Sequence, residues 1–201
     1  LDAKLRVEMR REIKKLHQQL KTTVVYVTHD QTEAMSLGTK IAIMNHGVIQ
    51  QNETPENIYN KPSNTFVADF IGSPSMNLIK GKLIKNSNNI SFIADDSSLE
   101  VPINNYDFKE NSDLNNKEIY FGIRPEHIYF KKLNEDDFDI SLRADLSEYI
   151  GHEQIVTLDY SNQEILAKFP STIKIELEKE MKLYFDLAHI SLFDLKTKER
   201  I

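Results

Sequence analysis

The spacing of apolar residues changes along the chain, from a helical period at the start to runs typical of strands. One stripe at a period of 3.6 residues predicts an amphipathic helix over the first twenty positions. Its members are Leu5, Met9, Ile13, Leu16 and Leu20. The next apolar run, Thr23–Thr28, is rich in β-branched residues and has no period, so we expect a fully buried parallel strand there.

Short helices and strands follow in alternation up to residue 72. Asp30 and Glu33 form a capping pattern that predicts a helix through about Leu37. A strand at 40–44, a turn at 45–47 and a strand at 48–52 predict a hairpin, and short helices are expected from Pro55 and over 63–71. Gly72 ends the second helix. This order of elements predicts α/β organisation.

Beyond residue 75 the helical period disappears and short alternating runs separated by turn-like clusters take over. They predict a small all-β barrel or sandwich, with a long loop over 104–116. The expected strands are 78–84, 90–94, 118–123, 127–131, 140–144, 154–159, 164–169, 182–187 and 190–193. We therefore predict two domains, an α/β segment over 1–75 and a β-domain over 76–201.

Composition narrows the possible functions. The chain has 201 residues, a formal net charge of −6 and no cysteine, which excludes disulfides and thiolate zinc sites and argues against a nucleic-acid partner. Seven basic residues fall within the first 21 positions, which we interpret as a solvated helix face. No apolar run is long enough for a membrane span. The chain begins with leucine and is expected to be a piece of a longer protein.

His29 is the first candidate for chemistry. A histidine at the carboxyl end of a buried strand, directly before a helix, faces the crevice where open α/β sheets bind ligands. A neutral imidazole there can donate a hydrogen bond to a terminal phosphate or hold an attacking water, although a histidine that merely completes a loop fits the position as well. Asp2 is a second candidate, but its position requires no more than an N-cap.

The β-domain offers weaker candidates. Neither Glu126-His127 nor His152-Glu153 chelates a metal by itself, because neighbours on a strand point to opposite faces. The acidic run 135–139 lacks the glycine and closing glutamate of a calcium loop and is expected to be a solvated turn, and residues 124–126 to be an ion-paired corner. The sequence contains no phosphate-binding loop, nucleophile elbow or H-E-x-x-H helix, so an autonomous enzyme is not expected.

A longer string resembles a known family. "VYVTHDQTEAMSLGTKIAIMNHGVIQQNETPENIYNKPSNTFVADFIGSPSMN" (25–77) is similar to the end of an ABC-transporter nucleotide-binding domain, and "LDAKLR" to the stretch that begins at its D-loop. "FGIRPEHI" and the terminal "LFDLKTKERI" resemble the regulatory TOBE domain of importer ATPases. "FVADFIGSPSMN" is most like the maltose and glycerol-phosphate importer branch, which implies carbohydrate as the cargo. Departures from the family are "SLGTKI" and Ser191, which stands where a histidine is common.

The resemblance implies roles for both candidates. His29 corresponds to the H-loop histidine, which contacts the γ-phosphate and positions the hydrolytic water. Asp2 corresponds to the D-loop aspartate, which reaches across the ATPase dimer. The full-length parent is then expected to use ATP and Mg²⁺ on the cytoplasmic face of the membrane, with a second copy, two permease subunits and a possible regulatory protein as partners. This fragment lacks the phosphate loop, the signature motif and the catalytic glutamate, and is expected to bind no cofactor and to be inactive alone.

Two other functions stay open for the β-domain. It can be a stand-alone OB-like module that binds a sugar, a small anion or a regulatory protein, since small OB-like barrels bind saccharides and oligonucleotides. It can also be only a spacer that holds the ATPase dimer. Tyrosines gathered on one open face would favour a ligand site, and tyrosines at a subunit seam would favour dimerisation; those concerned are Tyr120, Tyr129, Tyr149 and Tyr160. Without most of its sheet, the 23–28 run is expected to expose apolar surface.

Overall fold

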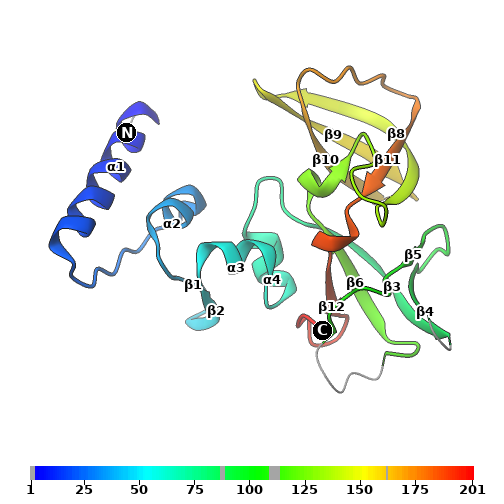
Figure 1. Cartoon of the computed structure of the whole chain (residues 1–201), viewed down its shortest axis with the longest axis horizontal. Coiled ribbons are helices and arrows are strands. Elements are labelled where there is room, and N and C mark those ends of the chain that lie inside the picture. Colours follow the sequence, from blue (N-terminus) through cyan, green and yellow to red (C-terminus); the bar gives the residue numbers. More distant parts are fainter. Residues whose placement is uncertain (1–2, 87–88, 109–113, 162) are drawn as a thin grey trace. The chain divides into compact units, whose positions relative to one another are not determined.

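A computed structural model describes residues 3–86, 89–108, 114–161 and 163–201 of the chain (Figure 1). The chain divides into two compact units, Leu1–Ser63 and Asn64–Ile201. Each unit is described by itself below. In the described residues, no helix is both long enough and apolar enough to cross a membrane.

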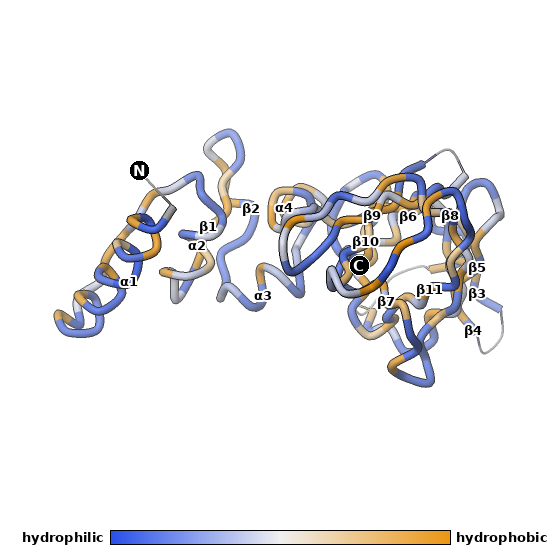
Figure 2. The backbone as a smooth tube through the Cα atoms, turned by 90° about the horizontal axis from the view of Figure 1, so that it is seen from above, coloured by the Kyte–Doolittle hydropathy of each residue, from blue (hydrophilic) through white to orange (hydrophobic). Residues whose placement is uncertain are grey.

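In its described residues, 3–63, the first unit contains three helices and a β-hairpin. They are α1 (Ala3–Leu20), α2 (Gln31–Leu37), β1 (Ile41–Asn45), β2 (Val48–Glu53) and α3 (Pro55–Asn60). His46 and Gly47 both have positive φ, 47° and 80°, as a tight hairpin turn requires, and Thr54 caps α3 through its side chain. Polar and apolar stretches alternate along α1 (Figure 2). The predicted helices and hairpin of this unit are therefore confirmed.

The strand predicted over Thr23–Thr28 is wrong. Residues 21–28 belong to no helix or strand, and Val25 and Val27 are 87% and 91% exposed. A strand needs a neighbour to pair its backbone groups, and β1 and β2, the strands of this unit, pair with each other. The β-branched run thus keeps its apolar side chains in solvent, which confirms the expectation of exposed apolar surface.

The described part of the second unit contains a short helix, α4 (Thr65–Phe70), and two antiparallel five-stranded sheets. The first sheet has the order β12-β6-β3-β4-β5 and the second the order β10-β9-β8-β11-β7. The strands of the first sheet are β3 (Asn77–Asn86), β4 (Asn89–Ala94), β5 (Glu100–Pro102), β6 (Glu118–Ile123) and β12 (Ser191–Asp194). Those of the second are β7 (Ile128–Tyr129), β8 (Phe138–Tyr149), β9 (Glu153–Tyr160), β10 (Gln163–Pro170) and β11 (Glu180–Phe185).

Both sheets bury their inner faces in one apolar core. Along β9 every second side chain is buried, as expected for a strand with one face covered. Phe121 of the first sheet stacks on Phe92 at 5.1 Å between ring centroids and lies 6.3 Å from Phe185 of the second sheet. All three rings are fully buried. The aromatic contacts therefore link the two sheets as well as filling each one.

The chain passes between the sheets through two short 3₁₀ turns. The turn η1 (Pro125–His127) leads from β6 to β7, and η2 (Leu187–His189) leads from β11 back to β12. The buried carboxylate of Asp186 accepts hydrogen bonds from the Tyr129 hydroxyl at 3.0 Å and the Ala188 amide at 3.0 Å, and its Oδ2 lies 2.7 Å from His189 Nδ1. Its own amide donates to the carbonyl of His127 at 3.0 Å. Asp186 thus links the two crossings, η1 and η2, through hydrogen bonds.

The structure corrects several details of the predicted β-domain. It adds β5, which is too short to show alternation. Of the strand predicted over 127–131, it places His127 in a 3₁₀ turn and keeps Ile128–Tyr129 as β7. Arg124 is buried, at 1% exposed, and its guanidinium donates to the carbonyl of Ile71 at 2.6 Å. In the long loop, residues 109–113 lie outside the described residues, and 103–108 and 114–117 contain no helix or strand.

The helix α4, assigned by sequence to the α/β segment, belongs to the second structural unit. The Thr65 amide donates to the carbonyl of Lys198, and Ala68 packs with Met76 and Phe193. Lys198 and Phe193 are distant from α4 in sequence, so local pattern does not reveal them. The domain boundary between residues 75 and 76 stays a prediction.

We expect Asp186→Ala to lower the free energy of unfolding by about 2–4 kcal/mol, because it removes a buried acceptor and leaves the Tyr129 hydroxyl and the Ala188 amide without their partner. Asp139→Ala is the matched control, since Asp139 is 66% exposed and pairs with Lys182 at the surface. Its cost should stay within about 0.5 kcal/mol. Urea unfolding followed by circular dichroism measures both variants, and equal costs would contradict the joint that we assign to Asp186.

Candidate functional site

His29 lies on the loop between residues 21–28 and α2, and its side chain is exposed. Within the described part of the chain, its imidazole takes part in no hydrogen bond or ion pair. A histidine that served only to complete the loop would spend its ring nitrogens on backbone groups. Here both nitrogens stay available to a ligand.

The residues on either side of His29, Thr28 and Asp30, are held by hydrogen bonds. The Asp30 amide donates to Thr28 Oγ1 at 3.0 Å, so a hydrogen bond joins the two residues that flank His29. The Asp30 carboxylate accepts from the Glu33 amide at 3.1 Å as the N-cap of α2. His29 is therefore a free side chain on a fixed loop.

The cap departs from the capping box that the sequence predicts. In a capping box the glutamate at the third helical position accepts from the backbone amide of the N-cap residue. In this structure Thr28 Oγ1 takes that amide, and the Glu33 carboxylate instead accepts from the hydroxyls of Thr28 at 2.7 Å and Tyr26 at 3.2 Å. Local pattern thus predicts the helix start correctly and the partner of Glu33 wrongly.

Charges near the loop favour an ionised Asp30. The hydrogen bond from the Glu33 amide lowers the pKa of Asp30, and the cations Arg10 and Arg6 on α1 lower it further. Arg6 Nη1 lies 3.8 Å from Asp30 Oδ2. Burial of its hydroxyl, followed by its hydrogen bond to Glu33, raises the pKa of Tyr26.

The second sequence candidate, Asp2, lies outside the described residues. Its predicted role as an N-cap or as a group that reaches a second subunit therefore stays a prediction.

The site fits a phosphate contact better than a metal. An exposed imidazole with free nitrogens can donate a hydrogen bond to a phosphate oxygen. In the residues that the structure describes, no three histidine or carboxylate side chains converge as a metal site requires. His29 can therefore contribute to a nucleotide site, whereas a magnesium ligand set would have to come from elsewhere.

The weaker candidates of the β-domain have structural partners. The His127 ring stacks on His189 at 4.4 Å between centroids, and burial, followed by the charge of His189, lowers the pKa of His127. The His152–Glu153 pair lies at the surface, where Lys168 also bonds Glu153 at 2.6 Å. Neither pair forms a metal site.

The acidic run over 135–139 is only partly a solvated turn. Asp137 is 6% exposed, and its carboxylate accepts from the backbone amides of Leu133 and Asn134, both at 2.8 Å. Asp137 therefore stabilises its own loop. The sequence did not reveal this role, because a run of acidic residues does not show which carboxylate accepts hydrogen bonds from the backbone.

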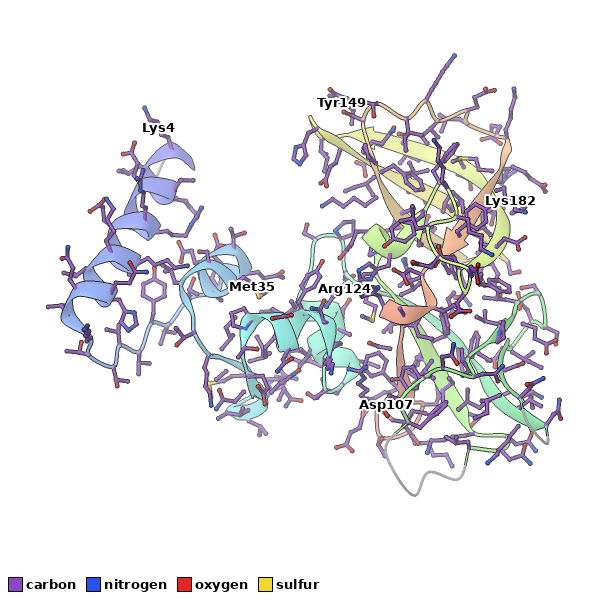
Figure 3. The ribbon with its side chains drawn as sticks, viewed as in Figure 1. Lys4, Met35, Asp107, Arg124, Tyr149 and Lys182 are labelled. Atoms are coloured by element: carbon purple, nitrogen blue, oxygen red, sulfur yellow. The ribbon has the colours of Figure 1, made fainter. Side chains whose placement is uncertain are left out.

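The tyrosines do not gather on one open face. Tyr160 is 5% exposed and Tyr129 bonds Asp186, whereas Tyr149 is 73% exposed at the end of β8 (Figure 3). The Tyr120 ring carries the Lys198 ammonium at 4.5 Å from its centroid. By the criterion set out above, nothing in this arrangement favours a stand-alone ligand site.

Comparisons with known proteins assign both β-sheets of the second unit to known domain families. The MalK OB fold domain family matches residues 72–128, and the TOBE domain family matches residues 121–193. The chain is 40% identical over 204 residues to the oligosaccharides import ATP-binding protein MsmX of Bacillus subtilis, and 38% identical over 208 residues to the trehalose/maltose import ATP-binding protein MalK of Thermococcus litoralis. The matches cover 100% of this chain and 55% and 54% of those proteins.

The chain thus carries the OB-fold and TOBE domains of importer ATPases. It is similar over its whole length to ABC-transporter ATP-binding proteins of sugar importers, which confirms the resemblance and the fold class predicted from sequence. The chain spans about half the length of the curated relatives that it matches. A solved structure of the cytoplasmic molybdate-binding protein ModG aligns with 58% of the chain at a TM-score of 0.45 and 12% identity, a likeness too low to carry an argument.

Carbon-13 NMR of the Asp30 carboxyl group provides a test of the loop electrostatics. Because its pKa is lowered, the ionised Asp30 supports α2 at any pH above its ordinary value of about 3.9, and the support is lost as the pH falls through the lowered pKa. We expect Arg6→Gln to raise the midpoint only slightly, since the Glu33 amide is the larger cause. A midpoint at or above 3.9 in the unchanged chain would show that the cap does not form.

Proposed function

We propose that this chain is part of the ATP-hydrolysing, energy-coupling subunit of an ABC importer for carbohydrates. The names of the relatives, which import oligosaccharides and trehalose or maltose, support the carbohydrate class. The observation that carries the proposal is the free, exposed imidazole of His29 on a loop in which both neighbouring residues, Thr28 and Asp30, are hydrogen-bonded.

In this proposal His29 donates a hydrogen bond to the γ-phosphate of ATP and orients the attacking water. Holding the backbone at Thr28 and Asp30 keeps the imidazole in place, so that little ordering is needed when nucleotide arrives. Asp2 approaches the same nucleotide from a second copy of the chain. ATP and Mg²⁺ supply the phosphoryl chemistry in the full-length protein, and no residue described here coordinates the metal.

The partners follow from the same proposal. A second copy completes the nucleotide site, two transmembrane permease subunits receive the conformational change, and the β-domain joins the copies or receives a regulatory protein. The protein then acts at the cytoplasmic face of the membrane. The chain by itself is inactive, because its sequence contains no G-x-x-x-x-G-K-[ST] loop to hold the phosphates.

Two measurements test the proposal. Calorimetry with ATP and Mg²⁺ should detect no binding to the 201-residue chain, and binding by an extended protein in which the N-terminal half of Bacillus subtilis MsmX precedes Leu1. In that extended protein, His29→Ala should lower kcat for ATP hydrolysis by about a hundredfold or more, because it removes a contact to the transferred phosphoryl group.

His152→Ala is the matched control, since the His152 side chain is 88% exposed in the second unit. We expect its kcat within about twofold of the unchanged protein. Micromolar ATP binding by the 201-residue chain would contradict a composite site and direct attention to the β-domain. Equal hydrolysis by the His29→Ala protein would contradict the role of His29.

A further inference from the structure

Glu33 is an unexpected residue in the first unit. Among the described residues of that unit it is the one charged side chain that is buried, at 9% exposed. Within the same part of the chain, no lysine, arginine or histidine pairs with its carboxylate. A buried carboxylate is costly unless hydrogen bonds satisfy it, so its surroundings show what it is for.

Both partners of the Glu33 side chain come from the segment that leads to His29. Tyr26 and Thr28 are two residues apart, and their side chains reach the same carboxylate. Both hydroxyls donate to the same oxygen, Oε2, at 3.2 Å and 2.7 Å. Hydrogen bonds to a charged acceptor are the stronger kind. Glu33 therefore fastens the segment before His29 to the first turn of α2.

The bonds around Thr28 support one another. Because the Thr28 hydroxyl donates a hydrogen bond to Glu33, its lone pairs are free to accept one from the Asp30 amide at 3.0 Å. A chain of bonds then runs from the Asp30 amide through Thr28 to Glu33, and donors and acceptors in such chains polarise each other. His29 is the residue that this chain of bonds encloses.

We propose that Glu33 is a positioning residue for His29: its carboxylate binds the hydroxyls of Tyr26 and Thr28 and thereby fixes the loop from which the imidazole reaches its ligand. This inference rests on the proposed function for the role of the imidazole, and on the structure alone for the position of the loop. It assigns to Glu33 no contact with nucleotide.

Two substitutions at Glu33 separate the acceptor from the bulk of the side chain. Glu33→Gln keeps a carbonyl oxygen that can accept both hydroxyls, whereas Glu33→Leu keeps a good helix former with no acceptor. Glu56→Leu is the matched control, because Glu56 is exposed in the first turn of α3. All three variants leave the Asp30 cap intact.

Nitrogen-15 relaxation of the 201-residue chain measures the loop directly. In the unchanged chain, the Glu33→Gln variant and the Glu56→Leu variant, we expect the backbone order parameters of 28–30 to stay near those of α2, about 0.85. In Glu33→Leu they should fall below about 0.6 while α2 keeps its helical shifts. Order in the Glu33→Leu loop, or disorder already in the unchanged chain, would overturn the proposal.

Kinetics of the extended protein link the loop to hydrolysis. We expect Glu33→Leu to lower kcat about tenfold and to leave KM for ATP within about twofold, because misplacing a catalytic group lowers the rate of the chemical step more than the affinity for substrate. Glu33→Gln should keep most of the rate, since it keeps an acceptor. Unchanged kcat in Glu33→Leu, with His29→Ala impaired, overturns the positioning role alone. A disordered loop in Glu33→Leu, with His29→Ala unimpaired, overturns the proposed function.

Discussion

The second unit depends on polar joints between its two sheets. Asp186 binds both crossings of the chain, and at another point of the sheet interface the Asn77 side chain accepts from the Leu166 amide at 2.8 Å and donates to the Leu166 carbonyl at 2.9 Å. An apolar core alone is non-directional and would tolerate sliding of one sheet over the other. The joints have fixed geometry, and leaving them unmade is costly because they are withdrawn from water. They therefore hold the register in which Phe121 meets Phe185.

A buried side chain beside the first crossing also shapes the start of the second unit. Arg124, directly before η1, fills the space beside Gly72, where a Cβ would come within 2.7 Å of the guanidinium. Gly72 also has a φ of +122°, which side-chain-bearing residues rarely adopt. The junction between α4 and β3 is thus shaped by a side chain some fifty positions later in the sequence.

The first unit is organised in a different way. Its hairpin and caps are local, while several large apolar side chains of α1 and of residues 24–27 remain exposed. The loop around His29 is constrained by side-chain hydrogen bonds, because Thr28, Asp30 and Glu33 bond one another. Order at a loop that carries a free imidazole is what a phosphate-binding role requires, because the imidazole must be in place before the ligand arrives.

Local sequence determined the features whose physical cause is local. Helical spacing located α1, the threonine and proline at 54–55 located α3, and Asn45-His46-Gly47 located the hairpin, because caps and turns depend on residues a few positions apart. The residue strings around His29 and Phe121 were also sufficient to predict the resemblance to importer ATPases. Tertiary structure alone decided that Arg124 and Asp186 are buried, that Glu33 bonds Tyr26 rather than its own helix cap, and that Thr23–Thr28 stays unpaired. Each of these depends on which groups meet in space, and neither strand pairing nor the desolvation of a charge can be read from residue spacing.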